Sequence, residues 1–151
     1  MPVVDDPVAG LAKYWFRARL MHELLHLRRE GMGSGIANMR QDDWWEIETY
    51  LCFWLSALWV VVEGFNKLKL KDARVQRLFK EHMPQLKAFR HETYHFVATA
   101  RQIPNHKQLN WAEDLHEGIS EFLSEYINKK VREAKKRRRP AKKRRAAITE
   151  P

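Results

Sequence analysis

Two short stretches of the sequence carry the pattern His-Glu-x-x-His, which is typical of zinc hydrolases. The first, HELLH, contains His22, Glu23 and His26, and the second, HETYH, runs from His91 to His95. On a helix, two histidines four residues apart lie on one face and both reach one metal ion, while the glutamate beside the first can activate a bound water. The pattern therefore raises the hypothesis of a zinc-dependent hydrolase.

A zinc hydrolase also needs a third ligand, which the sequence does not select. Glu113, Glu117 and Glu121 are acidic candidates on one later segment. The sequence shows no alternating strand against which a peptide substrate would lie. Packing of HELLH into a polar network of the first helix is the alternative that we favour, with no metal ion and no other cofactor. A joint site of four histidines remains a further alternative: His22, His26, His91 and His95.

Read from Arg90, the second stretch has a different pattern. Arg90 is followed by the polar His91, three more residues and His95, with phenylalanines on either side. This arrangement resembles the motif of the HEPN superfamily, in which an arginine precedes Asn, Asp or His and a histidine follows after four to six intervening residues. The resemblance covers residues 8–128 and implies a small all-α bundle that carries the motif on a late helix.

The resemblance implies a metal-independent endoribonuclease of a toxin-antitoxin or defence system, with RNA as substrate and an antitoxin protein as a further partner. Arg90, His95 and His91 are then the catalytic residues, and Glu92 and Tyr94 support them. The chemistry suits these side chains, because an imidazole transfers protons near neutral pH and a guanidinium pairs with two phosphate oxygens. A cyclic phosphate end is the expected product.

Helix geometry bears on how such a site is assembled. Five residues of an ideal helix turn through about 500°, which leaves Arg90 and His95 roughly 140° apart around the axis. We therefore expect a homodimer in which the face carrying Arg90 and His95 meets its copy. Two alternatives stay open: ion pairs of these residues with local acids such as Glu92, and a HEPN-like module that binds nucleic acid or assembles without cleaving RNA.

The positive charge of the chain is concentrated near its end. Of the 28 Lys and Arg residues and 19 Asp and Glu residues, 16 bases and 17 acids precede residue 129, a net charge of −1. We expect the basic stretch to bind nucleic-acid phosphates without base preference. Its basic residues are Lys129, Lys130, Arg132, Lys135, Lys136, Arg137, Arg138, Arg139, Lys142, Lys143, Arg144 and Arg145.

Composition and segment lengths point to an intracellular globular protein. The single cysteine, Cys52, excludes an internal disulfide framework and favours a reducing compartment. The N-terminus lacks the features of a secretory signal, and the longest uncharged run, 49–62, is too short for the roughly 20 residues of a membrane span. We expect a cytoplasmic protein without membrane contact, or a nuclear one if the source is eukaryotic.

The apolar residues recur at helical spacing throughout, which predicts an all-α, HEPN-like bundle of about five helices with a basic C-terminal extension. Asp6 and Asp72 are expected helix caps, and Pro84 is expected to begin a new helix. The expected domain spans 1–128 and the partly disordered tail 129–151. The expected helices span about 7–31, 42–64, 72–83, 84–102 and 111–140.

Two of these helices have distinctive apolar faces. The first carries Leu11 and Trp15 on one side but Phe16, Leu20 and Leu27 on the other, which predicts a core contact and a separate partner contact. The second is apolar nearly all round and is expected to be the most buried element.

Overall fold

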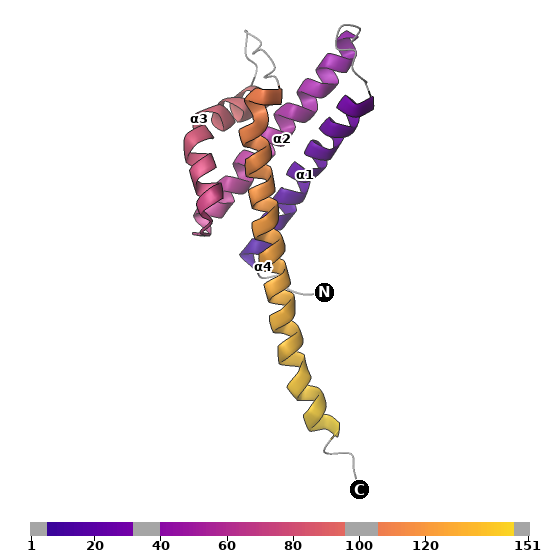
Figure 1. The fold of residues 1–151 in the computed structure, drawn as a ribbon, viewed down its shortest axis with the longest axis vertical. Helices are drawn as coiled ribbons and strands as arrows, with labels where there is room; N and C mark the ends of the chain where they lie inside the picture. Colours follow the sequence, from indigo (N-terminus) through magenta and orange to yellow (C-terminus); the bar gives the residue numbers. More distant parts are fainter. Residues whose placement is uncertain (1–5, 32–39, 96–105, 147–151) are drawn as a thin grey trace. The chain divides into compact units, whose positions relative to one another are not determined.

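The structure is a computed structural model that describes residues 6–31, 40–95 and 106–146, with side chains described from 108 to 136 in the last range. The described part contains four helices and no strands, so the all-α prediction is confirmed (Figure 1). By its internal contacts the chain divides into two units, Met1–Gly118 and Ile119–Pro151. The fold of the first unit positions the candidate sites.

Helix α1 spans Pro7–Gly31 and begins where the sequence predicts. Asp6 caps it, because its carboxylate accepts a hydrogen bond from the backbone N–H of Val8 at 2.9 Å. The predicted core face is buried at Leu11 and Trp15. Phe16, Leu20 and Leu27 are 55%, 41% and 64% exposed, so the second apolar face lies outside the core of this chain.

Helix α2 spans Gln41–Lys67 and is the central element, packed against both α1 and α3. Its N-terminal cap residue is Arg40, whose backbone N–H donates a hydrogen bond to the carboxylate of Asp43 at the third helical position. The helix does not stop at Gly64. A Cβ there would lie 2.6 Å from Leu11 Cδ1, so the glycine allows close packing of α1 on α2.

Helix α3 spans Ala73–Tyr94 and runs through Pro84, where the sequence predicts a break between two helices. That prediction is wrong, and it accounts for the difference between five expected helices and four observed. Pro84 removes one backbone hydrogen bond but leaves the rest of the helix intact, and α3 changes direction along its length (Figure 1). Buried Leu78 and Leu86 anchor the residues on both sides of the proline.

Helix α4 spans His106–Ala146 and belongs to both units. It begins before the expected start at residue 111 and continues past Pro140, so the basic stretch is helical as far as Ala146. Within the first unit, its segment 106–118 buries Leu109, Ala112 and Leu115.

The core of the first unit is built mainly from α2, as predicted. Ten α2 residues are buried, with Trp54 among the fully buried ones. Trp44 is 38% exposed because it lies in the first turn of the helix. Among the described residues, α2 is also the one helix long and apolar enough to cross a membrane, but a buried core helix meets the same criterion.

Candidate functional site

The HETYH stretch forms the C-terminal end of α3. Arg90, His91, Tyr94 and His95 are exposed, and the rings of His91 and His95 stack with centroids 4.7 Å apart. The helix ends at Tyr94, and His95 has an extended backbone with φ −131° and ψ 139°. The angle of roughly 140° calculated for a continuous helix therefore does not apply to the His95 side chain.

A buried contact with α2 fixes this end of α3. The Ser56 hydroxyl donates to Thr93 Oγ at 2.8 Å, and the Thr93 hydroxyl donates to the Phe89 carbonyl at 2.7 Å. Beside it, exposed Phe53 of α2 meets Tyr94 edge to face with ring centroids 6.2 Å apart. The motif thus lies on an anchored helix end with an aromatic pair next to it.

The predicted ion-pair alternative for this stretch finds little support. Across 6–31, 40–95 and 108–136, no ion pair with an acidic side chain involves Arg90 or His95. The half-buried Glu92 has an interaction of its own. Within those ranges, the exposed Arg90 has no acidic partner.

The basic stretch lies in the second unit. Its described side chains are all exposed on a helix: Lys129, Lys130, Arg132, Lys135 and Lys136. The side chains of the remaining predicted phosphate-binding residues lie outside the described part: Arg137, Arg138, Arg139, Lys142, Lys143, Arg144 and Arg145.

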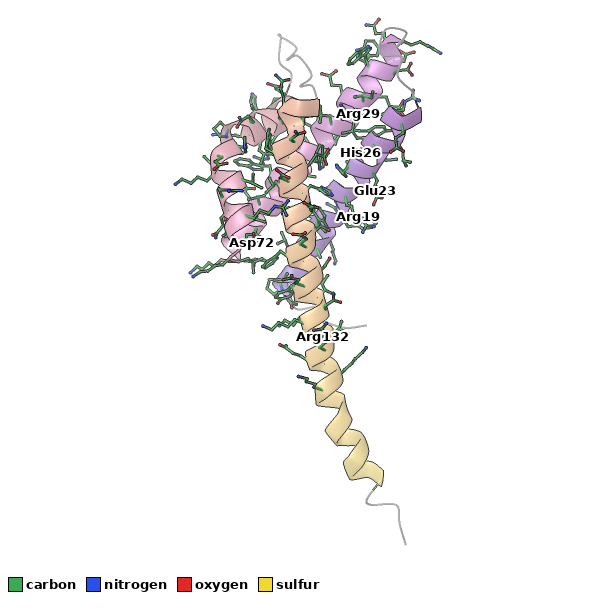
Figure 2. The ribbon with its side chains drawn as sticks, viewed as in Figure 1. Arg19, Glu23, His26, Arg29, Asp72 and Arg132 are labelled. Atoms are coloured by element: carbon green, nitrogen blue, oxygen red, sulfur yellow. The ribbon has the colours of Figure 1, made fainter. Side chains whose placement is uncertain are left out.

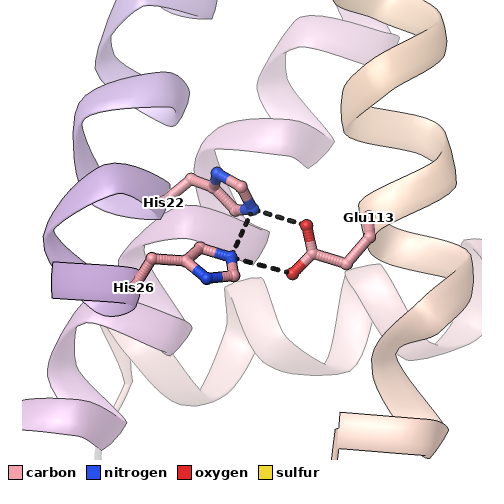
Figure 3. A group of neighbouring side chains, drawn as sticks. All are labelled: His22, His26 and Glu113. Atoms are coloured by element: carbon pink, nitrogen blue, oxygen red, sulfur yellow. Dashed lines mark hydrogen bonds and ion pairs between the residues drawn. The ribbon is translucent and has the colours of Figure 1, made fainter. Parts of the chain in front are cut away.

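The HELLH stretch lies in the middle of α1 and faces α4 (Figure 3). His22 Nε2 lies 2.5 Å from Glu113 Oε2, and His26 Nε2 lies 3.3 Å from Glu113 Oε1. The two Nε2 atoms are 3.0 Å apart. In the part of the chain that the structure describes, these three side chains are the one group of metal-ligating residues close enough to share an ion, and neither His91 nor His95 belongs to it.

Of the three acidic residues considered as a third metal ligand, Glu113 is therefore the one that lies beside His22 and His26. Glu117 instead forms an ion pair with Arg74 Nη2 at 2.5 Å, and Glu121 is exposed on the second unit. The HELLH glutamate, Glu23, does not join the cluster. It pairs with Arg19 Nε at 3.0 Å, and both side chains are about half exposed on α1 (Figure 2).

A second layer of rings lies behind His22, and the sequence analysis missed it. His22 stacks on His116 with centroids 4.1 Å apart and packs against Trp54 at 4.6 Å. Trp15 also packs against His116, with ring centroids 4.2 Å apart. One sequence feature could have indicated a buried His116: it lies within the apolar stripe of α4 that contains Ala112 and Leu115.

The surroundings shift two pKa values in this cluster. Burial, and to a smaller extent the charge of the neighbouring His22, lower the pKa of His116 to about 3. Burial raises the pKa of Glu113, but the hydrogen bonds and charges of His22 and His26 outweigh that effect and hold it below its usual value. Near neutral pH, His116 is therefore neutral and Glu113 is a carboxylate.

Comparison of the chain with protein-family models, curated proteins and solved structures found no match to any of them.

Proposed function

We propose that the chain binds and cleaves RNA without a metal ion, using Arg90, His91 and His95 as the HEPN resemblance implies. The observation that carries the proposal is the exposed, stacked pair of His91 and His95 at the anchored end of α3, where Arg90, the residue before His91, is exposed as well. An imidazole of one chain removes the proton from a 2′-hydroxyl, an imidazole of a second copy protonates the leaving oxygen, and Arg90 stabilises the negative charge on the phosphate oxygens.

The stacked rings also favour the homodimer. In-line displacement places the attacking and leaving oxygens on opposite sides of phosphorus. His91 and His95 lie together on one side of their own helix end, with centroids 4.7 Å apart. A histidine of a second copy transfers a proton on the opposite side of phosphorus. The exposed pair of Phe53 and Tyr94 offers apolar surface for such an interface.

The basic segment of α4 adds affinity but no base preference. Its exposed lysines and arginines form contacts with phosphates that weaken as salt increases. No aromatic residue occurs from 129 to 145, so base stacking is not expected within this stretch.

Cleavage of a mixed-sequence single-stranded RNA by the full chain tests the proposal. His95→Ala and Arg90→Ala are expected to lower the cleavage rate by at least about 100-fold, the lower end of a general acid–base contribution. EDTA should leave the rate unchanged, and the product should carry a 2′,3′-cyclic phosphate. Lys87→Ala is the matched control, because Lys87 is exposed on the same helix.

Complementation tests the shared site. A mixture of the Arg90→Ala and His95→Ala variants, allowed to exchange subunits, should recover part of the activity that neither has alone. Equal cleavage by His95→Ala and the parent would contradict the catalytic assignment. Binding of RNA by the parent without any cleavage would support the non-catalytic module instead.

The zinc-hydrolase alternative is not favoured by the position of Glu23. In that mechanism Glu23 would activate the metal-bound water, yet it is 52% exposed and pairs with Arg19.

A further inference from the structure

We infer that His22, His26 and Glu113 bind one divalent transition-metal ion, for which Zn²⁺ is the best match, and that this ion links α1 to the first part of α4. The inference does not depend on the proposed RNA cleavage, because it concerns different residues and a structural role. The three ligands all lie within the first unit of the chain.

The distances are close to those of a coordinated ion. With ligands at about 2.0–2.1 Å in a tetrahedral arrangement, neighbouring ligand atoms lie about 3.3 Å apart. The two Nε2 atoms are 3.0 Å apart, and His26 Nε2 is 3.3 Å from Glu113 Oε1. The His22 contact with Glu113, at 2.5 Å, requires only a small outward movement of the glutamate side chain.

The protons of the cluster give a second, independent argument. Each neutral imidazole offers either a donor or an acceptor at Nε2. If both Nε2 atoms carry protons, the two donors face each other at 3.0 Å; if either lacks one, its lone pair faces the ionised carboxylate of Glu113. No arrangement of ring protons makes all three contacts favourable. A cation accepts the lone pairs of all three groups at once.

The surroundings provide both a rigid support and access. His22 packs against both His116 and Trp54, of which Trp54 is fully buried. The His22, His26 and Glu113 side chains are 17%, 38% and 28% exposed, so an ion can reach them from solvent. Supporting residues of this kind fix the orientation of a metal ligand.

The ligand chemistry selects the ion. Two imidazoles and one carboxylate suit Zn²⁺ and its neighbours in the first transition row, whereas Mg²⁺ and Ca²⁺ prefer sites made of oxygen ligands. Water completes the fourth position. Because Glu23 pairs with Arg19 rather than facing the cluster, the ion stabilises the contact between two helices and does not serve a hydrolytic reaction.

Titration of the EDTA-stripped full chain with Zn²⁺ alone, followed by calorimetry and metal analysis, tests the site. One ion per chain is expected. His26→Ala removes the most exposed ligand, and Glu113→Gln keeps the side-chain shape but removes its charge. Each should weaken binding by at least roughly 100-fold, the upper end of what loss of a supporting residue costs.

The second HExxH stretch supplies the matched control. The double variant His91→Ala/His95→Ala removes an exposed histidine pair of the same spacing and should bind Zn²⁺ as the parent does. Co²⁺ bound to the parent should show the absorption of a tetrahedral site without a thiolate band, a measurement that needs no variant. Undiminished stoichiometric binding in both ligand variants, or no binding by the parent, would overturn the inference.

Discussion

Trp54 and His116 form a buried hydrogen bond between α2 and α4, in which Trp54 Nε1 donates to His116 Nδ1 at 3.1 Å. Trp54 is fully buried and His116 is 9% exposed. The bond requires a lone pair on Nδ1, and therefore a neutral imidazole with its proton on Nε2. The packing of two helices thus depends on the protonation state of one histidine.

This relationship predicts that the fold loses stability in mild acid. The pKa of His116 falls from 6.5 to about 3 on folding, so between these values the unfolded chain binds the additional proton. The free energy of unfolding should therefore decrease as pH falls from 6.5, with a slope approaching about 1.4 kcal/mol per pH unit. The pKa of Glu113 is also lowered on folding, so below pH 4.5 its protonation further decreases the free energy of unfolding.

The variant His116→Asn shows how much of this pH dependence of stability comes from His116. An asparagine oxygen can accept the Trp54 N–H but does not titrate. Urea unfolding at a series of pH values, with EDTA present, should give a flatter profile for the variant than for the parent between pH 6.5 and 5. Parallel profiles would show that His116 is not the group responsible.

A second prediction concerns the ion pairs that join α1 to α2. Arg28 contacts Asp43 through Nη2 and Glu46 through Nε, the latter at 2.7 Å. The arginine is only 34% exposed, and Arg28→Met would leave two partly buried carboxylates without it. Chemical denaturation should show a loss of about 1–2 kcal/mol in the free energy of unfolding.

Arg19→Met is the matched control for that substitution. Arg19 pairs with Glu23 within α1, and the two side chains are 50% and 52% exposed. An exposed pair of this kind contributes at most about 0.5 kcal/mol on a helix surface. Equal losses for the two arginine variants would contradict the role of Arg28 in joining the helices.

Sequence alone predicts those features of this fold that depend on neighbouring residues. Asp6 and Asp72 cap their helices as predicted, because each carboxylate reaches a backbone N–H two or three residues later. The helix break predicted at Pro84 is wrong, because the packing of both halves of α3 outweighs the loss of one backbone hydrogen bond. Helix propensity cannot weigh such tertiary contacts.

The candidate metal site likewise combines a local feature, which the sequence predicts, with long-range contacts, which it does not. The spacing of His22 and His26 on one helix face is local and could be predicted. The choice of Glu113 could not, because it depends on the register of α1 against α4, which no sequence pattern determines. His116 and Trp54 were unpredictable as partners for the same reason, since they lie 62 residues apart in the chain.

Removal of metal should lower the thermal stability of the chain. A ligand present at 100 times its dissociation constant stabilises a fold by about 2.7 kcal/mol, which corresponds to a rise in Tm of roughly 5–10 °C for a domain of this size. Adding EDTA to the zinc-loaded parent should reverse that rise. His26→Ala should show no change with EDTA, whereas the His91→Ala/His95→Ala variant should respond as the parent does.

The basic segment of α4 should control the salt dependence of RNA binding. Replacing Lys129, Lys130, Arg132, Lys135 and Lys136 by glutamine removes five exposed charges. If each contacts a phosphate, the slope of log affinity against log salt should become less negative by about 0.7 per charge. Fluorescence anisotropy with a labelled single-stranded RNA, measured at several salt concentrations, gives this slope.

Five exposed lysines outside the segment provide the control for net charge. They are Lys67, Lys69, Lys71, Lys80 and Lys87. Their replacement by glutamine changes the charge of the chain equally, but it should alter the slope much less, because these residues are dispersed over α2, α3 and the turn between them. The same change in slope for both variants would mean that overall charge, rather than the α4 segment, attracts the RNA.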